Sequence, residues 1–502
     1  RRDDRRRGPP GAAGRGRTGR MDTLRFGTDG WRDRIGERFT VANVRRAAQA
    51  TADVLAADGA TRVVVAHDTR FGGPMFAAAA AETLAANGLT VHLAEGPLPT
   101  PVLSFAVRHL GADAGVMLTA SHNPPAWNGF KLKGAYGGTA TEEVYRAVAA
   151  RVAQVGPEQL REDPDAADRT QPLEVREAYY EALTRLLDLD LLRGLRGVLV
   201  HDAMGGAAAG WMAGFARHAR LELTVEGLRD EADPLFHGAH PEPIPAHLGP
   251  LAARMAAGDA RLGVATDGDG DRLGAVLPGG RILTAHEIFA LLLDRRQRDG
   301  AHGRVVKTFT VARLVERIAR ARGLEVVETP VGFKWLVDEM LRGDVLIAGE
   351  ESGGIGVPDH LPERDGIANG FLLAQALAGA EREDGPTDVP GGPLAARLTA
   401  LSAEAGWRHA YDRSDLRLAD EDAQARVLAA LRDDPDAFAG RAVTSVERRD
   451  GVKLNLGGNA WLLIRPSGTE PLLRVYCEGP SADEVAELLA RAEAFVRDAA
   501  RR

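Results

Sequence analysis

Hydrophobic positions along about the first 360 residues follow two alternating patterns. Short apolar runs end in polar, glycine-containing loops, at Val63–Val65, Val116–Leu118, Val198–Val200 and Val345–Ile347. Segments of helical spacing separate these runs. One such helix is predicted between Thr40, a candidate N-cap, and Gly59. This β-α-β-α rhythm predicts mainly parallel sheets, whose ligands collect at the carboxyl ends of the strands.

The pattern changes towards the C-terminus. A break rich in Gly, Pro and Asp falls around Glu381–Pro393. Beyond it, Trp461–Ile464 and Leu472–Cys477 are predicted strands that flank a loop. A capping box at Ser481 opens a last helix. Its predicted buried side is Val485, Leu488, Leu489, Ala492 and Val496. The last hundred or so residues are therefore expected to form a smaller α+β domain.

The length of 502 residues is enough for about three or four domains. A polar, acidic segment at Gln154–Thr170 is a further candidate boundary. These patterns predict an α/β fold with mainly parallel sheets and a smaller α+β domain at the C-terminus.

Composition narrows the class of protein. With 44% apolar and 27% charged residues, the chain lies in the range of soluble globular proteins. No apolar run approaches the roughly 20 residues that span a bilayer, so we expect no membrane association. The one cysteine, Cys477, cannot form an intrachain disulfide. Since no apolar signal segment opens the chain, we expect a cytoplasmic protein.

The formal net charge of −8 is unevenly distributed. Residues 1–20 hold eight Arg and two Asp, or +6, which leaves −14 for residues 21–502. This balance argues against a basic body that binds nucleic acid. The segment Gly14–Gly19 matches the dinucleotide-binding pattern G-x-G-x-x-G, but no strand precedes it and no helix follows, so we reject that site.

A metal site is indicated by Asp267-Gly-Asp-Gly-Asp-Arg272, which follows the short apolar run Leu262–Ala265. Alternate carboxylates on a flexible turn can converge, and charges about 4 Å apart repel by about 4 kcal/mol at an effective dielectric near 20. Three together need a cation, and hard oxygen ligands favour Mg²⁺ or Ca²⁺. The alternative is a solvated acidic turn.

A second loop, Thr119–Pro125, also follows a strand-like run. Its two prolines would stiffen it and leave the Ser121 hydroxyl at a strand end, with His122 and Lys131 near it in sequence. A hydroxyl that accepts and releases a phosphoryl group needs such exposure, a proton shuttle and a metal. The alternative is an ordinary turn, because Ser, Asn, Gly and Pro all favour turns.

Two further loops lie after predicted strands. Arg465–Pro471 offers a guanidinium, two hydroxyls and open backbone N–H groups, which could hold a phosphate. In Gly349–Gly354, Glu350 could accept hydrogen bonds from sugar hydroxyls and Ser352 could donate them. Each loop alone is a weak signal, because tight turns outnumber ligand loops.

The order of these motifs is more specific than any one of them. The loops at Ser121, Asp267, Gly349 and Arg465 resemble the four signature loops of the α-D-phosphohexomutase superfamily, the phosphoglucomutase/phosphomannomutase enzymes. The opening Phe26-Gly-Thr-Asp-Gly-Trp-Arg32 is similar to that family's first-strand motif. The resemblance runs from about residue 24 to residue 480. It implies an α/β fold in which three successive mixed-sheet α/β domains and a C-terminal α+β domain surround one central cleft. The expected divisions are a disordered basic tail or upstream sequence at 1–20, α/β domains at 21–170, 171–280 and 281–390, and an α+β domain at 391–502.

The resemblance implies a role for each motif. Ser121 would carry a phosphoryl group and would hold Mg²⁺ together with Asp267, Asp269 and Asp271. The implied catalytic residues are Ser121, His122, Lys131, Arg32 and His360. The implied substrate-binding residues are Arg272, Gly332, Lys334, Glu350, Ser352, Arg465, Ser467, Gly468 and Thr469. One departure concerns Gly354, where some mutases of the family have His; the segment around His360 resembles the phosphoglucomutase arrangement instead.

The implied reaction interconverts hexose 1-phosphate and hexose 6-phosphate through a phosphoserine and a hexose 1,6-bisphosphate, with glucose as the first expectation. Mannose and glucosamine phosphates are alternatives, as are a sugar-bisphosphate synthase, a phosphatase and a non-catalytic sugar-phosphate-binding homologue. The expected partners are small hexose phosphates, with neither nucleic acid nor membrane, in a monomer or homodimer.

Overall fold

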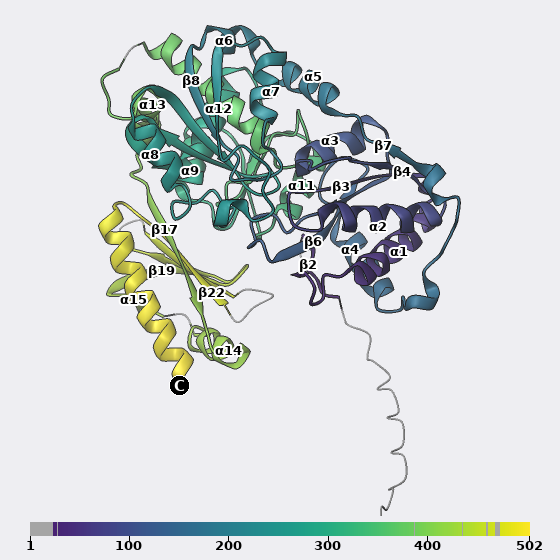
Figure 1. Cartoon of the computed structure of the whole chain (residues 1–502). Coiled ribbons are helices and arrows are strands. Elements are labelled where there is room, and N and C mark those ends of the chain that lie inside the picture. Colours follow the sequence, from purple (N-terminus) through teal and green to yellow (C-terminus); the bar gives the residue numbers. More distant parts are fainter. Residues whose placement is uncertain (1–23, 28, 386, 434, 458–459, 467–471) are drawn as a thin grey trace, which may run out of the picture.

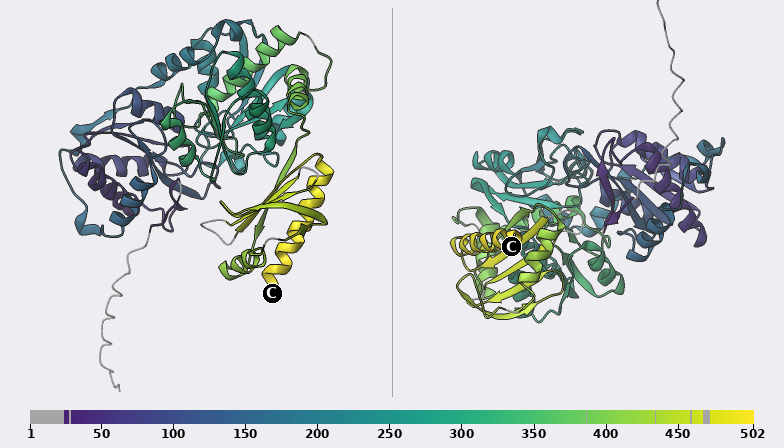
Figure 2. Two further views of the ribbon diagram at one scale, coloured as in Figure 1. Left: turned by 180° about the vertical axis from the view of Figure 1, so that it is seen from behind. Right: turned by 90° about the horizontal axis from the view of Figure 1, so that it is seen from below.

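The computed structural model describes residues 24–27, 29–385, 387–433, 435–457, 460–466 and 472–502 (Figure 1). The predicted tail at 1–20 lies outside the described residues. The described residues fold into four units, each built on one sheet. In Figure 1 and in the left view of Figure 2, the C-terminal unit forms a lobe of its own beside the other three.

The first sheet has seven strands in the order β1-β2-β6-β5-β3-β4-β7. Strands β3, β4, β5 and β7 are parallel, whereas β1, β2 and β6 add antiparallel neighbours at one side. The strands are β1 Phe26–Gly27, β2 Gly30–Arg34, β3 Arg62–His67, β4 Thr90–Leu93, β5 Ala114–Leu118, β6 Trp127–Gly134 and β7 Thr170–Pro172.

Helices cover both faces of this sheet. Side chains of β3 alternate, so that Val63 and Val65 pack into one core and Val64 and Ala66 into another. The helices are α1 Val41–Ala57, α2 Gly73–Ala86, α3 Thr100–His109 and α4 Glu142–Val152. The predicted first helix is confirmed, because the Thr40 side chain accepts a hydrogen bond from the Asn43 N–H and caps α1.

The second sheet is also mixed, in the order β12-β11-β10-β8-β9. Its strands are β8 Gly197–Asp202, β9 Leu223–Leu228, β10 Ala260–Thr266, β11 Leu273–Leu277 and β12 Arg281–Leu283. Its helices are α5 Arg176–Leu186, α6 Leu189–Gly194, α7 Trp211–His218 and α8 Gly249–Ala256. Strands β8 and β10 are parallel, so their carboxyl ends point to the same edge.

The third sheet has the order β14-β13-β15-β16. Its strands are β13 Arg304–Thr308, β14 Val326–Thr329, β15 Val345–Gly349 and β16 Ile355–Gly356. Its helices are α9 Ala285–Arg298, α10 Arg313–Ala321, α11 Phe333–Arg342, α12 Gly366–Asp384 and α13 Gly392–Glu404. One apolar core runs from α3 through the second unit into α9 and α12, so the first three units are packed together.

The fourth sheet is antiparallel, in the order β17-β22-β21-β20-β19-β18. Its strands are β17 Ala410–Arg417, β18 Ala437–Phe438, β19 Arg441–Glu447, β20 Val452–Leu456, β21 Trp461–Pro466 and β22 Leu472–Gly479. Helices α14 Glu421–Ala430 and α15 Ala482–Arg501 complete the unit. The predicted buried side of the last helix is confirmed, and Ser481 accepts from the Glu484 N–H.

These four units confirm the predicted fold class: three mixed-sheet α/β units followed by an α+β unit. Buried polar contacts join them. The Lys133 ammonium on β6 lies 2.5 Å from the Glu363 carboxylate of the third unit, and the Lys453 ammonium on β20 donates to the Phe309 carbonyl at 3.0 Å. In the described part of the chain, no helix combines the length and apolar character that crossing a bilayer requires.

Candidate active site

Three of the predicted loops begin just beyond the carboxyl ends of strands. Ser121 follows β5, Asp267 follows β10 and Glu350 follows β15, one strand from each of the first three units. The second unit's loop reaches the first unit closely, since a Cβ on Gly268 would lie 2.7 Å from the Ser121 carbonyl oxygen. The fold therefore brings loops from separate units to one place.

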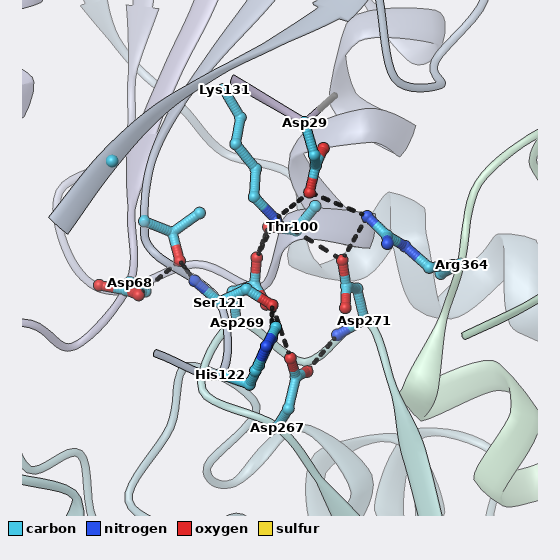
Figure 3. Close-up of polar contacts among 12 residues, drawn as sticks. Asp29, Asp68, Thr100, Ser121, His122, Lys131, Asp267, Asp269, Asp271 and Arg364 are labelled. Carbon is cyan, nitrogen blue, oxygen red and sulfur yellow. Dashed lines mark hydrogen bonds and ion pairs between the residues drawn. The ribbon is translucent and has the colours of Figure 1, made fainter. Parts of the chain in front are cut away.

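Ser121 is directed at the acidic loop (Figure 3). Its Oγ donates to Asp267 Oδ2 at 2.9 Å, and His122 Nδ1 lies 3.4 Å from the same Ser121 oxygen. The backbone of Ser121 has a φ of 53°, a left-handed conformation that serine rarely adopts. Burial, followed by the charges of Arg272 and Arg32, holds the pKa of His122 well below its usual range, so its imidazole is neutral.

The three aspartates of the loop converge as predicted. Asp267, Asp269 and Asp271 are fully buried, and one oxygen of each lies within 4.8 Å of the others. Among the described residues, Asp269 Oδ1 and Asp271 Oδ1 have no hydrogen-bond partner. Burial and then the neighbouring Asp271 and Asp269 raise the pKa of Asp267 well above its usual range. Hard oxygen ligands with spare acceptor capacity fit a Mg²⁺ ion.

Lys131 supplies positive charge to this cluster from β6. Its ammonium lies 2.9 Å from Asp269 Oδ2 and 3.2 Å from Asp29 Oδ2 (Figure 3). Burial opposes ionisation of this amine, but Asp269, Asp29 and Asp271 raise its pKa above the usual range. With these carboxylates beside it, Lys131 is a fixed cation rather than a base.

Arg364, from the loop before α12, was not predicted. Its guanidinium lies 2.9 Å from Asp271 and 3.5 Å from Asp29, and 3.7 Å from Glu350. A Cβ on Gly354 would lie 2.5 Å from Arg364 Cδ, so a side chain at position 354 would collide with Arg364 as it lies here. The departure at Gly354 noted in the sequence thus leaves the space that Arg364 fills.

Arg32 and Arg272 also lie beside the cluster. Arg32 Nη1 donates to Asn123 Oδ1 at 2.9 Å and its Nη2 to Asp29 Oδ2 at 3.1 Å. Arg272 Nε lies 4.0 Å from Asp267, and its backbone N–H donates to the same carboxylate at 3.1 Å. Both guanidiniums therefore stand next to the Ser121 and Asp267 loops.

Glu350 has the electrostatics of a group that titrates near neutrality. It is buried, and burial raises its pKa to about 7, with Arg364 opposing the shift and Glu351 adding to it. Ser352 is half-buried in the turn between β15 and β16.

Other predicted residues have different surroundings. His360 Nε2 lies 3.0 Å from Asp365, which itself caps α12, and its ring packs against Tyr179. The Lys334 ammonium contacts Glu142 of the first unit at 2.7 Å, and Gly332, with a φ of 126°, precedes α11. These contacts do not join His360 or Lys334 to the Ser121 cluster, so their roles stay predictions.

The fourth unit contributes Arg465, which lies 3.0 Å from Asp450. Ser467, Gly468 and Thr469 lie outside the described residues, so their predicted role is not placed. The charge of Arg474 on β22 also lowers the pKa of His122, with a smaller effect than burial, Arg272, Arg32 and Lys131.

Sequence reasoning missed Asp29, Thr100 and Arg364. Asp29 lies within the first-strand motif, where only Arg32 was selected, so a signal for it was present. Thr100, the first residue of α3, donates from its Oγ1 to Asp269 Oδ2 at 2.7 Å. No local sequence pattern indicates that Thr100 belongs to the site. Arg364 is distant in sequence from the aspartates that it contacts, so only the tertiary structure shows that it belongs to the site.

Comparison with known proteins agrees with this geometry. Family models for phosphoglucomutase/phosphomannomutase match four segments: α/β/α domain I at residues 23–158, domain II at 177–280, domain III at 284–387 and the C-terminal domain at 416–494. Together these matches cover most of the chain in the order that the family has.

Whole-length relatives give the same result. A phosphoglucosamine mutase from Moorella thermoacetica is 33% identical over 93% of this chain and 97% of its own. A phosphoglucomutase/phosphomannomutase from Thermococcus kodakarensis is 29% identical over 92% and 96%. A crystal structure from Thermus thermophilus, named as a candidate phosphomannomutase, aligns with a TM-score of 0.83 and 43% identity over 95% of this chain and 99% of that one.

With its four domain matches in order and relatives of full length, the chain belongs to the phosphoglucomutase/phosphomannomutase family of the α-D-phosphohexomutase superfamily, whose members are intramolecular phosphotransferases.

Proposed function

We propose that this protein interconverts the 1-phosphate and 6-phosphate of a hexose, with glucose as the preferred sugar, through a phosphorylated Ser121 and a hexose 1,6-bisphosphate. The observation that carries the proposal is the 2.9 Å contact between Ser121 Oγ and Asp267, one of three buried carboxylates that converge. A hydroxyl held against a cation-demanding cluster is suited to phosphoryl transfer.

In the first transfer, the bond between phosphorus and Ser121 Oγ breaks while a bond from phosphorus to the free sugar hydroxyl forms. The proton of that hydroxyl moves to a base, and we assign this role to His122, whose neutral ring nitrogen lies 3.4 Å from Ser121 Oγ. His122 would then give the proton to the departing Ser121 Oγ. A phosphoryl dianion beside this ring would raise its basicity. In the second transfer, after the bisphosphate turns around, a bond forms from Ser121 Oγ to the other phosphorus while the bond from that phosphorus to the sugar oxygen breaks. The Ser121 hydroxyl proton would move to His122 and from there to the departing sugar oxygen.

Asp267, Asp269, Asp271 and the phosphorylated Ser121 would hold the Mg²⁺ ion. When bound, Mg²⁺ offsets the negative charge of the phosphoryl group and polarises it. Lys131, Arg32 and Arg364 stand around the same cluster as fixed cations and would orient the phosphoryl oxygens.

The third unit would bind the sugar, and the fourth unit would bind the phosphate that is not being transferred. Glu350 and Ser352 would exchange hydrogen bonds with the sugar hydroxyls, while Arg465, with the predicted Ser467, Gly468 and Thr469, would hold the phosphate that is not transferred. If this phosphate site accepts either the 1-phosphate or the 6-phosphate of the bisphosphate, the sugar can bind in both orientations. Closure of this unit would exclude water from the phosphoserine.

Glucose is preferred here because Gly349-Glu-Glu-Ser352 and the segment at His360 resemble phosphoglucomutases. The specific observation for a second candidate is that similar full-length proteins are named phosphoglucosamine mutase and phosphomannomutase. Glucosamine and mannose phosphates are therefore the alternative substrates.

Replacing Ser121 with Ala removes the acceptor oxygen, so we expect turnover of glucose 1-phosphate to fall at least about 10³-fold. The same change should abolish the phosphorylated species seen by intact-mass spectrometry after incubation with glucose 1,6-bisphosphate. Ser104→Ala is the matched control, because Ser104 is an equally buried serine on α3 outside the site. Retention of turnover by Ser121→Ala would contradict the phosphoserine mechanism.

The choice of sugar is checked by comparing kcat/KM for the 1-phosphates of glucose, mannose and glucosamine in parallel. We expect glucose 1-phosphate to be favoured by about tenfold, as one well-placed hydroxyl contact allows. A higher kcat/KM for glucosamine or mannose 1-phosphate would refute the glucose assignment and leave the mutase chemistry in place.

Glu350 should impose an acidic limit on activity. Its pKa of about 7 is raised from the ordinary 4.5, so the carboxyl gains a proton as the pH falls below about 7 and no longer accepts fully from sugar hydroxyls. We expect kcat/KM to decline below pH 7 in the wild type. The ratio of wild type to Glu350→Gln cancels the titration of the substrate phosphate, and a ratio that does not change with pH would contradict this role.

A further inference from the structure

Arg70 is a buried arginine that holds the backbone of the Ser121 loop, although no sequence motif singled it out. It lies in the loop between β3 and α2 and is 1% exposed. Its two terminal nitrogens donate to four backbone carbonyls: those of Ser121 at 2.5 Å, Asn123 at 2.7 Å and Pro124 at 2.7 Å in the loop, and that of Trp127 at 2.9 Å at the start of β6. One guanidinium thus holds the whole loop.

The same side chain is anchored from the other direction. Asp68 accepts from Arg70 Nε at 3.0 Å and from the Arg70 backbone N–H at 2.9 Å. Asp68 also accepts from the Thr119 hydroxyl at 2.6 Å, and that hydroxyl oxygen accepts from the Ser121 N–H at 2.8 Å. The Ser121 peptide groups are therefore held on both sides, at N–H and at C=O.

These hydrogen bonds act at the residue of the loop whose backbone conformation is strained. Ser121 has a φ of 53°, and a non-glycine residue in that region persists only when its surroundings enforce it. The direction of Ser121 Oγ towards Asp267 depends on this backbone conformation. The loop is also closely packed, since a Cβ on Gly129 would lie 2.3 Å from the Thr119 carbonyl oxygen.

Phe236 of the second unit covers the guanidinium, with Arg70 Cζ 4.8 Å from the ring centroid. This contact shields the hydrogen bonds of Arg70 from water and ties the support of the Ser121 loop to the unit that carries the three aspartates. The contact therefore fixes the two partners of phosphoryl transfer relative to each other.

We infer that Arg70 is a positioning residue for phosphoryl transfer, which sets the left-handed backbone of Ser121 and so aims its Oγ at the aspartate cluster. Arg70 touches no reacting atom. This inference rests on the proposed phosphoserine role of Ser121. A lysine cannot replace Arg70, because an ammonium is a point charge with three donors, whereas the planar guanidinium presents five in a fixed fork.

The test compares Arg70→Lys with Arg46→Lys in the full chain. Arg46 is a matched control in the same unit: it is buried, and it donates to the Val155 carbonyl at 2.8 Å and the Val152 carbonyl at 3.2 Å, at the end of α4. We expect Arg70→Lys to lower kcat about 100-fold with KM nearly unchanged, as a misplacement of about 1 Å does. Arg46→Lys should lower the melting temperature to a similar extent while kcat stays near the wild-type value.

A second readout follows the Ser121 oxygen directly. Phosphorylation of Ser121 by glucose 1,6-bisphosphate, timed by intact-mass spectrometry, should slow in Arg70→Lys by about the same factor as kcat. Equal kcat in the two lysine variants, or a loss confined to KM, would overturn the inference.

If Arg70→Lys does not fold, substitutions of Thr119 test the inference instead. Thr119→Val removes the oxygen between Asp68 and the Ser121 N–H and should slow phosphorylation, whereas Thr119→Ser retains the oxygen and should restore the rate. Equal rates for these two variants would overturn the inference. The proposed function has its own separate test: it would be refuted if Ser121→Ala retained turnover.

Discussion

The burial of three carboxylates within a few ångströms of one another is the constraint on which the rest of this site depends. Like charges at that separation repel by about 4 kcal/mol per pair at an effective dielectric near 20. The burial of Asp267, Asp269 and Asp271 therefore requires compensation. The first unit supplies Lys131 and the third supplies Arg364. The spare carboxylate oxygens leave room for a cation, and the Ser121 hydroxyl already lies against the Asp267 carboxylate.

This constraint also explains why the site is assembled from several units. A single α/β unit presents only the loops at the carboxyl ends of its own strands. Here those ends carry Ser121 on β5, Asp267 on β10 and Glu350 on β15, and the shared apolar core of the first three units keeps the loops together. The fourth unit is joined at contacts such as the hydrogen bond from Lys453 to the Phe309 carbonyl, and it lies as a separate lobe.

Sequence reasoning found the parts of the site that are local in the chain. The aspartate trio and Ser121 stand on short loops after apolar runs, so their chemistry could be inferred from the residue types and their spacing. Thr100, Arg364 and Arg70 could not be inferred in this way, because most of their partners are distant in sequence and only packing brings them together. Asp29 was within reach, since it lies in the first-strand motif beside Arg32. Gly354 shows the limit clearly: its departure from the family pattern was visible, but the side chain that occupies the space, Arg364, became evident only from the fold. The class and order of the four units were predictable because strand and helix periodicities are local.

The most direct test of the central claim is a crystal structure of the protein phosphorylated on Ser121 and loaded with Mg²⁺. The account predicts one metal ion bound by Asp267, Asp269 and Asp271 together with a phosphate oxygen on Ser121, and Lys131 and Arg364 still beside the carboxylates. A phosphoserine turned away from the aspartates, or a metal ion bound at some other group of residues, would contradict it.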